Sequence, residues 1–221
     1  MRVLLRCQRP CTPAAHSACY VGFMRHTAVA AVLACALSAL GLSARATVFR
    51  AVPIATLTQR ADAVVIARRV SGLDPRAEMR GGRVYTTTVL EVSRVLARGP
   101  RATGLGPRVA VVLPGGVVDG PTGPVAQRVE GTPALSSDAW SVVLLHRAAD
   151  GAWTVLNLSL GVLPLHPPSP GANDWRVMPP GLGGIELVDV AGRPAAPDAL
   201  GIPPSGIALA EFVRRLSGST P

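Results

Sequence analysis

The sequence predicts an all-β, mainly antiparallel domain that closes into a small OB-like barrel, with a β-sandwich as the alternative. Apolar and polar residues alternate over 83–97, which is the two-residue period of a strand buried on one face. Shorter β-branched runs recur at 63–70, 108–113 and 140–146. Glycine, proline or aspartate separates the runs, as turns between close strands require.

Three elements are expected before the long strand. A short helix over 54–61 places Ile54 and Leu57 on one side. The β-branched run 63–70 predicts the first strand of the barrel. The segment 71–82, which contains an Asp-Pro pair and a Gly-Gly pair, predicts a loop.

The long strand is expected over 83–97. Its even positions carry the apolar residues Val84, Leu90, Val92 and Leu96. One face of this strand should therefore be buried. Because the strand exceeds the usual length, we expect a bend or bulge near 86–88.

The second half of the barrel is expected to begin with a central strand over 108–113, ended by Pro114-Gly115-Gly116. Residues 117–139 lack a clear pattern and predict a long loop, with a short strand at 127–130. A hairpin follows, in which strands 140–146 and 153–160 flank a turn at Ala149-Asp150-Gly151.

The C-terminal part is expected to differ from the barrel. Ten of the 21 prolines fall within 164–204, and proline removes the backbone donors that long strands need. Only two short strands, at 175–178 and 185–190, are expected there. Ser205 is predicted to cap a helix over 206–216. Its apolar stripe consists of Leu209, Phe212, Val213 and Leu216.

The predicted domain boundaries follow from these patterns. Residues 1–46 form a signal region, 47–165 the barrel, 166–204 a Pro/Gly-rich extension, and 205–217 a helix that packs on the barrel.

The N-terminal region is predicted to be an export signal over 24–46. Arg25 precedes an apolar run at 28–42, and Ala44-Arg45-Ala46 fits the small-x-small pattern of signal peptidase. We expect residues 1–23 to be an over-extended reading frame, with a long n-region as the alternative. The mature protein is then secreted or periplasmic, without a membrane span.

A lipid anchor at Cys35 is the alternative to soluble export. Ala34 supplies the small residue that a lipobox needs before its cysteine, but Leu33 is bulky for its place. The other cysteines are Cys7, Cys11 and Cys19, so the predicted mature chain has no thiol for a disulfide, a nucleophile or a zinc site.

The charge pattern excludes several functions. The chain has no lysine, which rules out a P-loop lysine, a Schiff base and a Ser–Lys dyad. Removal of the signal region lowers the formal charge from +9 to +4.

Seven arginines are candidate contacts to nucleic acid: Arg68, Arg69, Arg83, Arg94, Arg98, Arg101 and Arg108. Only Tyr85 lies near them as a stacking aromatic, so we expect no nucleic-acid partner.

No catalytic, cofactor or metal residue is assigned. His146 is expected to be a half-buried structural residue at a strand end and His166 to be solvated, and neither has a short ligand spacing to Asp150 or Asp174. The Ser136-Ser137-Asp138 run is typical of a turn. The acids Glu78, Glu91, Asp119 and Glu130 form no evident pair for hydrolysis. Gly181, Gly183 and Gly184 indicate a turn, not a phosphate loop.

Four segments carry a resemblance to known proteins: ADAVVIARRVSG, RVYTTTVLEVSRVLARG, RVAVVLPGG and VEGTPALSSDAWSVVLLHR. Their shared pattern, ADxVV…YTxxxLEV…VxVxxPGG, resembles a family of uncharacterised secreted bacterial proteins over 60–157, and ALAEFVRRL resembles the family's closing helix. Ser137-Asp138 and Arg98 depart from the family pattern, which has Gly-Glu and Lys there. The resemblance implies a fold and export, but no activity.

The first half also distantly resembles the netrin-like OB folds of tissue inhibitors of metalloproteinases. Those inhibitors bind the protease zinc through an N-terminal cysteine, whereas the predicted mature chain begins at Thr47.

Three functions follow as hypotheses. The preferred one is a secreted, non-catalytic module that binds a protein or a cell-envelope component. The second is an extracytoplasmic hydrolase that uses Asp119, Glu130, Ser137 or Asp138 from loop 117–139. The third is an inhibitor of a secreted protease, which rests on the fold analogy alone.

Overall fold

The computed structural model describes residues 47–168 and 174–218. The predicted signal region 1–46, with its alternative anchor at Cys35, lies outside the described residues. No helix in the described part of the chain is both long and apolar enough to cross a membrane.

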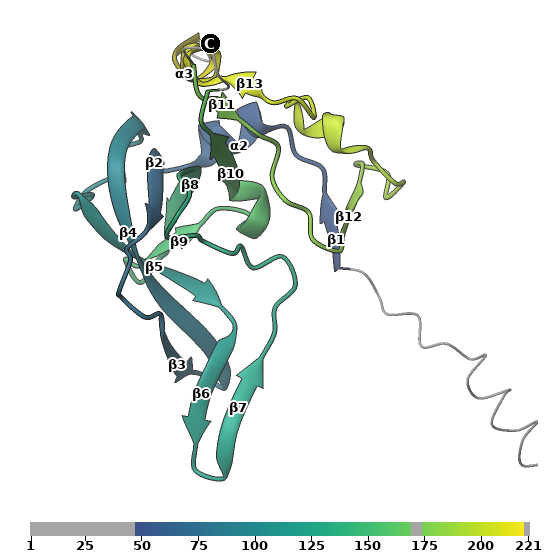
Figure 1. The fold of residues 1–221 in the computed structure, drawn as a ribbon. Helices are drawn as coiled ribbons and strands as arrows, with labels where there is room; N and C mark the ends of the chain where they lie inside the picture. The colour runs from purple at the N-terminus through teal and green to yellow at the C-terminus, as the bar shows by residue number, and fades with distance from the viewer. Residues whose placement is uncertain (1–46, 169–173, 219–221) are drawn as a thin grey trace, which may run out of the picture. The chain divides into compact units, whose positions relative to one another are not determined.

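Five strands form a closed barrel (Figure 1): β2 (Ala63–Arg69), β4 (Arg83–Arg98), β5 (Arg108–Pro114), β8 (Ser141–Arg147) and β9 (Trp153–Val155). The pairs β2–β4, β4–β5, β2–β8 and β8–β9 are antiparallel. Val111 of β5 pairs with Trp153 of β9 in parallel and closes the ring. The predicted OB-like barrel is therefore confirmed, and its sheet is mixed because of this one pairing.

The interior of the barrel is filled by alternate residues of its strands. Ala63, Val65 and Ala67 of β2 share this core with Val143 and Leu145 of β8. Val109, Val111 and Leu113 of β5 complete one wall. The alternation follows from the period of a strand, whose successive side chains point to opposite faces.

Strand β4 contains two irregularities, and they do not lie near residues 86–88, where we expected a bend. The pairing with β2 skips Leu96 and Ser93. Each extra residue reverses which face the following side chains occupy. Val92 and Val95 consequently both contact the barrel core, whereas Leu96 packs on the outside, contrary to the predicted even-numbered face.

A second hydrophobic core covers the outer face of β2 and β8. Val64 and Ile66 of β2 contact it, as do Val142 and Leu144 of β8. The covering elements are α2 (Ile54–Arg60), β10 (Val162–His166) and α3 (Leu209–Gly218). Because β2 and β8 are buried on both faces, their sequences are continuous apolar runs without alternation.

Short strands before, within and after the Pro/Gly-rich segment add to this architecture. Strands β10, β11 (Arg176–Val177) and β13 (Ile207–Ala208) extend the sheet outward from β8. Strand β12 (Ile185–Val188) pairs in parallel with β1 (Thr47–Arg50), and a short 3-10 helix covers Pro197–Leu200.

The predicted start of the final helix is wrong. Gly206 has a φ of +71°, and the two following residues pair with β11 in β13. The helix α3 therefore begins at Leu209, and Ser205 is not its cap.

Three strands occur where the sequence predicted loops. They are β3 (Arg76–Arg80), β6 (Gly116–Gly120) and β7 (Gly123–Gln127). Their residues are largely exposed, so no apolar alternation marks them. The strand expected at 127–130 is absent, because β7 ends at Gln127.

The hairpin partner β9 is shorter than predicted. It ends at Val155, and Asn157 and Leu158 then adopt positive φ values of 58° and 53°. A 3-10 helix follows at Leu158–Gly161, and it turns the chain into β10.

Candidate functional site

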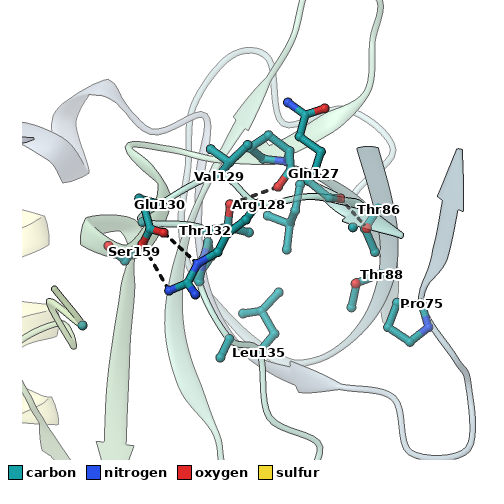
Figure 2. Close-up of a pocket in the computed structure, with 18 of the residues that line it drawn as sticks. Pro75, Thr86, Thr88, Gln127, Arg128, Val129, Glu130, Thr132, Leu135 and Ser159 are labelled. Carbon is teal, nitrogen blue, oxygen red and sulfur yellow. Dashed lines mark hydrogen bonds and ion pairs between the residues drawn. The ribbon is translucent and has the colours of Figure 1, made fainter. Parts of the chain in front are cut away.

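A cavity of about 920 Å³ lies at one mouth of the barrel (Figure 2). Its lining comes from β4, from the end of β5, from the base of the β6–β7 hairpin, and from loops around 128–135 and 181–185. The cavity therefore combines segments that are distant in sequence.

Two threonines on the inner face of β4 line this mouth. Thr88 pairs with Val111 and Thr86 with Leu113, and directly opposed residues of a sheet share one face. The Thr86 hydroxyl donates a hydrogen bond to Gly115 O at 2.6 Å. Thr88 is only 5% exposed, and its hydroxyl has no hydrogen-bond partner among the described residues.

The Pro114-Gly115-Gly116 motif shapes the cavity wall. Gly115 and Gly116 have φ values of +94° and +134°, where side chains are strained. A Cβ atom on Gly116 would overlap the Thr86 hydroxyl. Both glycines are thus required for the chain to pass from β5 directly into β6 while lying against β4.

The opposite wall is formed by Gly131, Thr132 and the 3-10 helix. Gly131 has a φ of +80°, and its O accepts a hydrogen bond from the Ser159 N–H at 2.8 Å. The Thr132 hydroxyl donates to Pro114 O at 3.0 Å. Ser159 is 6% exposed, and its Oγ atom has no partner in the part of the chain that the structure describes. This wall therefore also presents an unused hydrogen-bonding group.

The guanidinium of Arg69 lies at the cavity without a partner among the described residues. Arg69, the last residue of β2, is half-buried and lines the cavity. It pairs with Leu90 and follows the inward residues Val65 and Ala67 at strand spacing. Within the described ranges, its guanidinium makes no hydrogen bond or ion pair.

The neighbouring Arg68 has two partners on the other face of β2. Its guanidinium lies 4.5 Å from the centroid of the Trp140 ring, and its Nε donates to Glu91 Oε2 at 3.0 Å. Adjacent arginines thus differ in availability because successive strand residues face opposite ways.

The rest of the lining is largely apolar. Leu113 and Leu135 contact the barrel core at the cavity floor. Val117 and Ala126 pair across the β6–β7 hairpin and extend the apolar surface outward. Val117 is 60% exposed, which is unusual for a β-branched apolar side chain beside a cavity.

The residues considered for hydrolysis are not brought together. Asp119 lies in the exposed β6 strand, opposite Pro124. Glu130 lines the cavity, where its Oε1 lies 2.7 Å from Arg128 Nε (Figure 2). Ser137 donates to Asp138 at 3.1 Å in an exposed turn, and neither lines the cavity.

His146 lies at the far end of β8 from this turn, because five residues of strand span about 17 Å. It is half-buried, as expected for a structural residue. Its Nδ1 lies 2.8 Å from Asp62 Oδ2, but without hydrogen-bond alignment. The same oxygen accepts the Arg147 N–H at 2.8 Å. The acid beside His146 is thus Asp62, which the sequence analysis did not consider.

The remaining predicted positions do not form a site. His166 is exposed at the end of β10. Within residues 47–168 and 174–218, no group of three His, Cys, Asp or Glu side chains is arranged to hold a metal ion. Of the seven arginines considered for nucleic acid, only Arg69 lines the cavity.

Thr88 and Ser159 were not among the residues predicted from the sequence. A signal for Thr88 was present, because it occupies the same even-numbered face of β4 as Val84 and Leu90. A polar residue in a buried register is a candidate for function. Ser159 has no such signal, since it lies outside a regular strand.

No protein-family model matches the chain, and no curated protein or solved structure matches it. The fold assignment therefore rests on the strand pairing itself.

Proposed function

We propose that the chain is an exported, non-catalytic module that binds another protein through the cavity at the barrel mouth. The observation that carries this proposal is the cavity of about 920 Å³, whose lining is mostly apolar with a few unpartnered polar groups. Such a lining is typical of binding sites, in which apolar contacts give affinity and isolated polar groups fix orientation.

The surface beside the cavity supports a protein partner. Val117 and Ala126 carry the apolar lining from the cavity onto the projecting β6–β7 hairpin. A contiguous apolar surface that reaches beyond a pocket suits a macromolecule better than a small ligand. Export, expected from the segment 24–46, places the partner outside the cytoplasm.

Site-specific crosslinking tests this proposal. A photo-crosslinking amino acid replaces Val117 in one variant and Val190 in a control variant, since Val190 is 78% exposed and does not line the cavity. Both variants are produced in the native host and irradiated in intact cells. We expect a discrete protein adduct at position 117 only, and its loss when Ala126→Arg is added. Absence of an adduct, or the same adduct at both positions, would refute the proposal.

No observation favours the hydrolase or the protease inhibitor over this function. Of the four hydrolase candidates, only Glu130 lines the cavity, and it is paired with Arg128. The inhibitor hypothesis rests on fold analogy, which does not carry function.

A further inference from the structure

The barrel mouth is blocked below the cavity. Val111 lies opposite Thr88 on β5, Leu90 follows Thr88 on the same face of β4, and both are completely buried. Interiors packed in this way leave no passage for a chain. Whatever enters the mouth must therefore end there. A loop of a partner would have to enter and leave through the same opening, whereas a chain terminus needs to enter only once.

The polar groups at this blocked end suit an anion. Arg69 carries a positive charge without a partner among the described residues. Thr88 lies on the same inner face, two positions along β4 from Leu90, the residue that Arg69 pairs with. A guanidinium with a nearby hydroxyl is well suited to bind a carboxylate, because both are donors and the guanidinium fork matches two carboxylate oxygens.

Burial makes these groups effective. Thr88 and Ser159 are each more than nine-tenths buried. The Ser159 Oγ is a buried atom without a hydrogen-bond partner among the described residues, and the Thr88 hydroxyl makes no hydrogen bond there either. An unpaired buried hydroxyl carries a desolvation cost that a bound ligand can offset. Leu113 and Leu135 line the same cavity, so an apolar group attached to the carboxylate would be buried at the same time.

We infer that the barrel mouth binds a carboxylate attached to an apolar group, held by Arg69 and Thr88, and that its source is the C-terminal residue of a partner polypeptide. This inference rests on the proposed function, because it names the part of the partner that enters the cavity. A free apolar acid carries the same chemistry and is distinguished by the test.

The test measures binding to the purified full chain by isothermal titration calorimetry. The probes are hexapeptides ending in leucine, valine or phenylalanine, each with a free C-terminus and as the C-terminal amide, and decanoate. We expect at least one free-acid peptide to bind, and its amide to bind at least tenfold more weakly. The variants Arg69→Gln and Thr88→Val should each weaken the free acid at least fivefold.

Arg94→Gln is the matched control. Arg94 also lies in a barrel strand and is exposed, but it does not line the cavity. The substitution removes the same charge, and affinity should stay within twofold of the unsubstituted chain. Thermal unfolding of each variant identifies any loss of affinity that reflects loss of folding.

Each contrary outcome has a distinct meaning. Equal binding of acid and amide overturns the carboxylate inference and leaves the protein-binding function standing. Binding of decanoate alone overturns the polypeptide source. An equal effect of Arg69→Gln and Arg94→Gln overturns the role of Arg69, and failure of every probe overturns the inference, while the crosslinking at Val117 judges the proposed function separately.

Discussion

Asp62 joins the ends of three barrel strands, and its removal should destabilise the fold. The residue precedes β2 and is 9% exposed. Its backbone N–H donates to Leu145 O at 2.9 Å, and its backbone O accepts from Gly99 N–H at 2.7 Å. Its side-chain Oδ2 accepts the Arg147 N–H at 2.8 Å. A substitution at this position leaves the backbone bonds intact and removes the side-chain contacts, which are the hydrogen bond from Arg147 and the approach of His146 Nδ1.

The size of the effect follows from that contact. The variant Asp62→Ala loses a hydrogen bond to a carboxylate and leaves the Arg147 N–H without its acceptor, which costs about 2 kcal/mol. The variant Asp62→Asn keeps an oxygen at the same place and should cost less than about 1 kcal/mol. The comparison of the stability lost in the two variants therefore separates the contribution of the hydrogen bond from that of the charge.

Urea unfolding followed by tryptophan fluorescence provides the measurement. For a denaturant slope of about 2 kcal/mol per M, the Ala variant should unfold at a urea concentration roughly 1 M lower. His146→Ala is the control, because His146 approaches the same oxygen without hydrogen-bond alignment, and its effect should be smaller. A midpoint for Asp62→Ala equal to that of the unsubstituted chain, or an equal loss in the Asn variant, would refute this reasoning.

Three further predictions concern other parts of the described fold. Gly116→Ala should lower the free energy of unfolding by about 1–3 kcal/mol, because the φ of +134° at this position strains a side chain. Adding Thr86→Ala to this variant should recover part of the lost stability in urea unfolding. No recovery would contradict the overlap of the new Cβ atom with the Thr86 hydroxyl. Leu163→Ala should lower the free energy of unfolding by about 2–5 kcal/mol, since Leu163 is fully buried in the outer core. Calorimetry and far-UV circular dichroism should show one coincident unfolding transition. Two separate transitions would show instead that this core unfolds separately from the barrel. The backbone N–H and guanidinium of Arg193 lower the pKa of the Asp189 carboxyl, so its stabilising effect is present at neutral pH and disappears as pH falls through the lowered pKa. Arg193→Ala removes the guanidinium and keeps the backbone N–H, so it should raise that pKa only part of the way toward its ordinary value in an NMR titration. An unchanged value would contradict the contribution of the guanidinium.

Elements were predicted correctly where the local apolar periodicity matches their burial. The helix α2 and the strands β5 and β8 were all predicted near their observed bounds. These elements have apolar residues at spacings that a helix or strand must bury. Strand β3 and the β6–β7 hairpin were not predicted, because their exposed residues carry no apolar pattern and only pairing with neighbouring strands orders them.

The candidate site was less predictable than the fold. Arg69 was considered, but for nucleic acid, and nothing local distinguished it from the engaged Arg68. Thr88 and Ser159 are about 70 residues apart in the chain, and only the arrangement of β4 and the 3-10 helix places both at one cavity.

The sequence by itself determined which segments with a clear apolar pattern form buried strands and helices, because solvent exclusion acts on each side chain according to the repeat of its own element. Only the tertiary structure decided how the barrel closes, since the single parallel pair of Val111 and Trp153 joins residues distant in the chain. The two skipped residues in β4, the second core outside β2 and β8, and the shared cavity likewise depend on contacts between distant segments. Such contacts depend on how complete elements pack together, and the apolar pattern of a single element does not predict them.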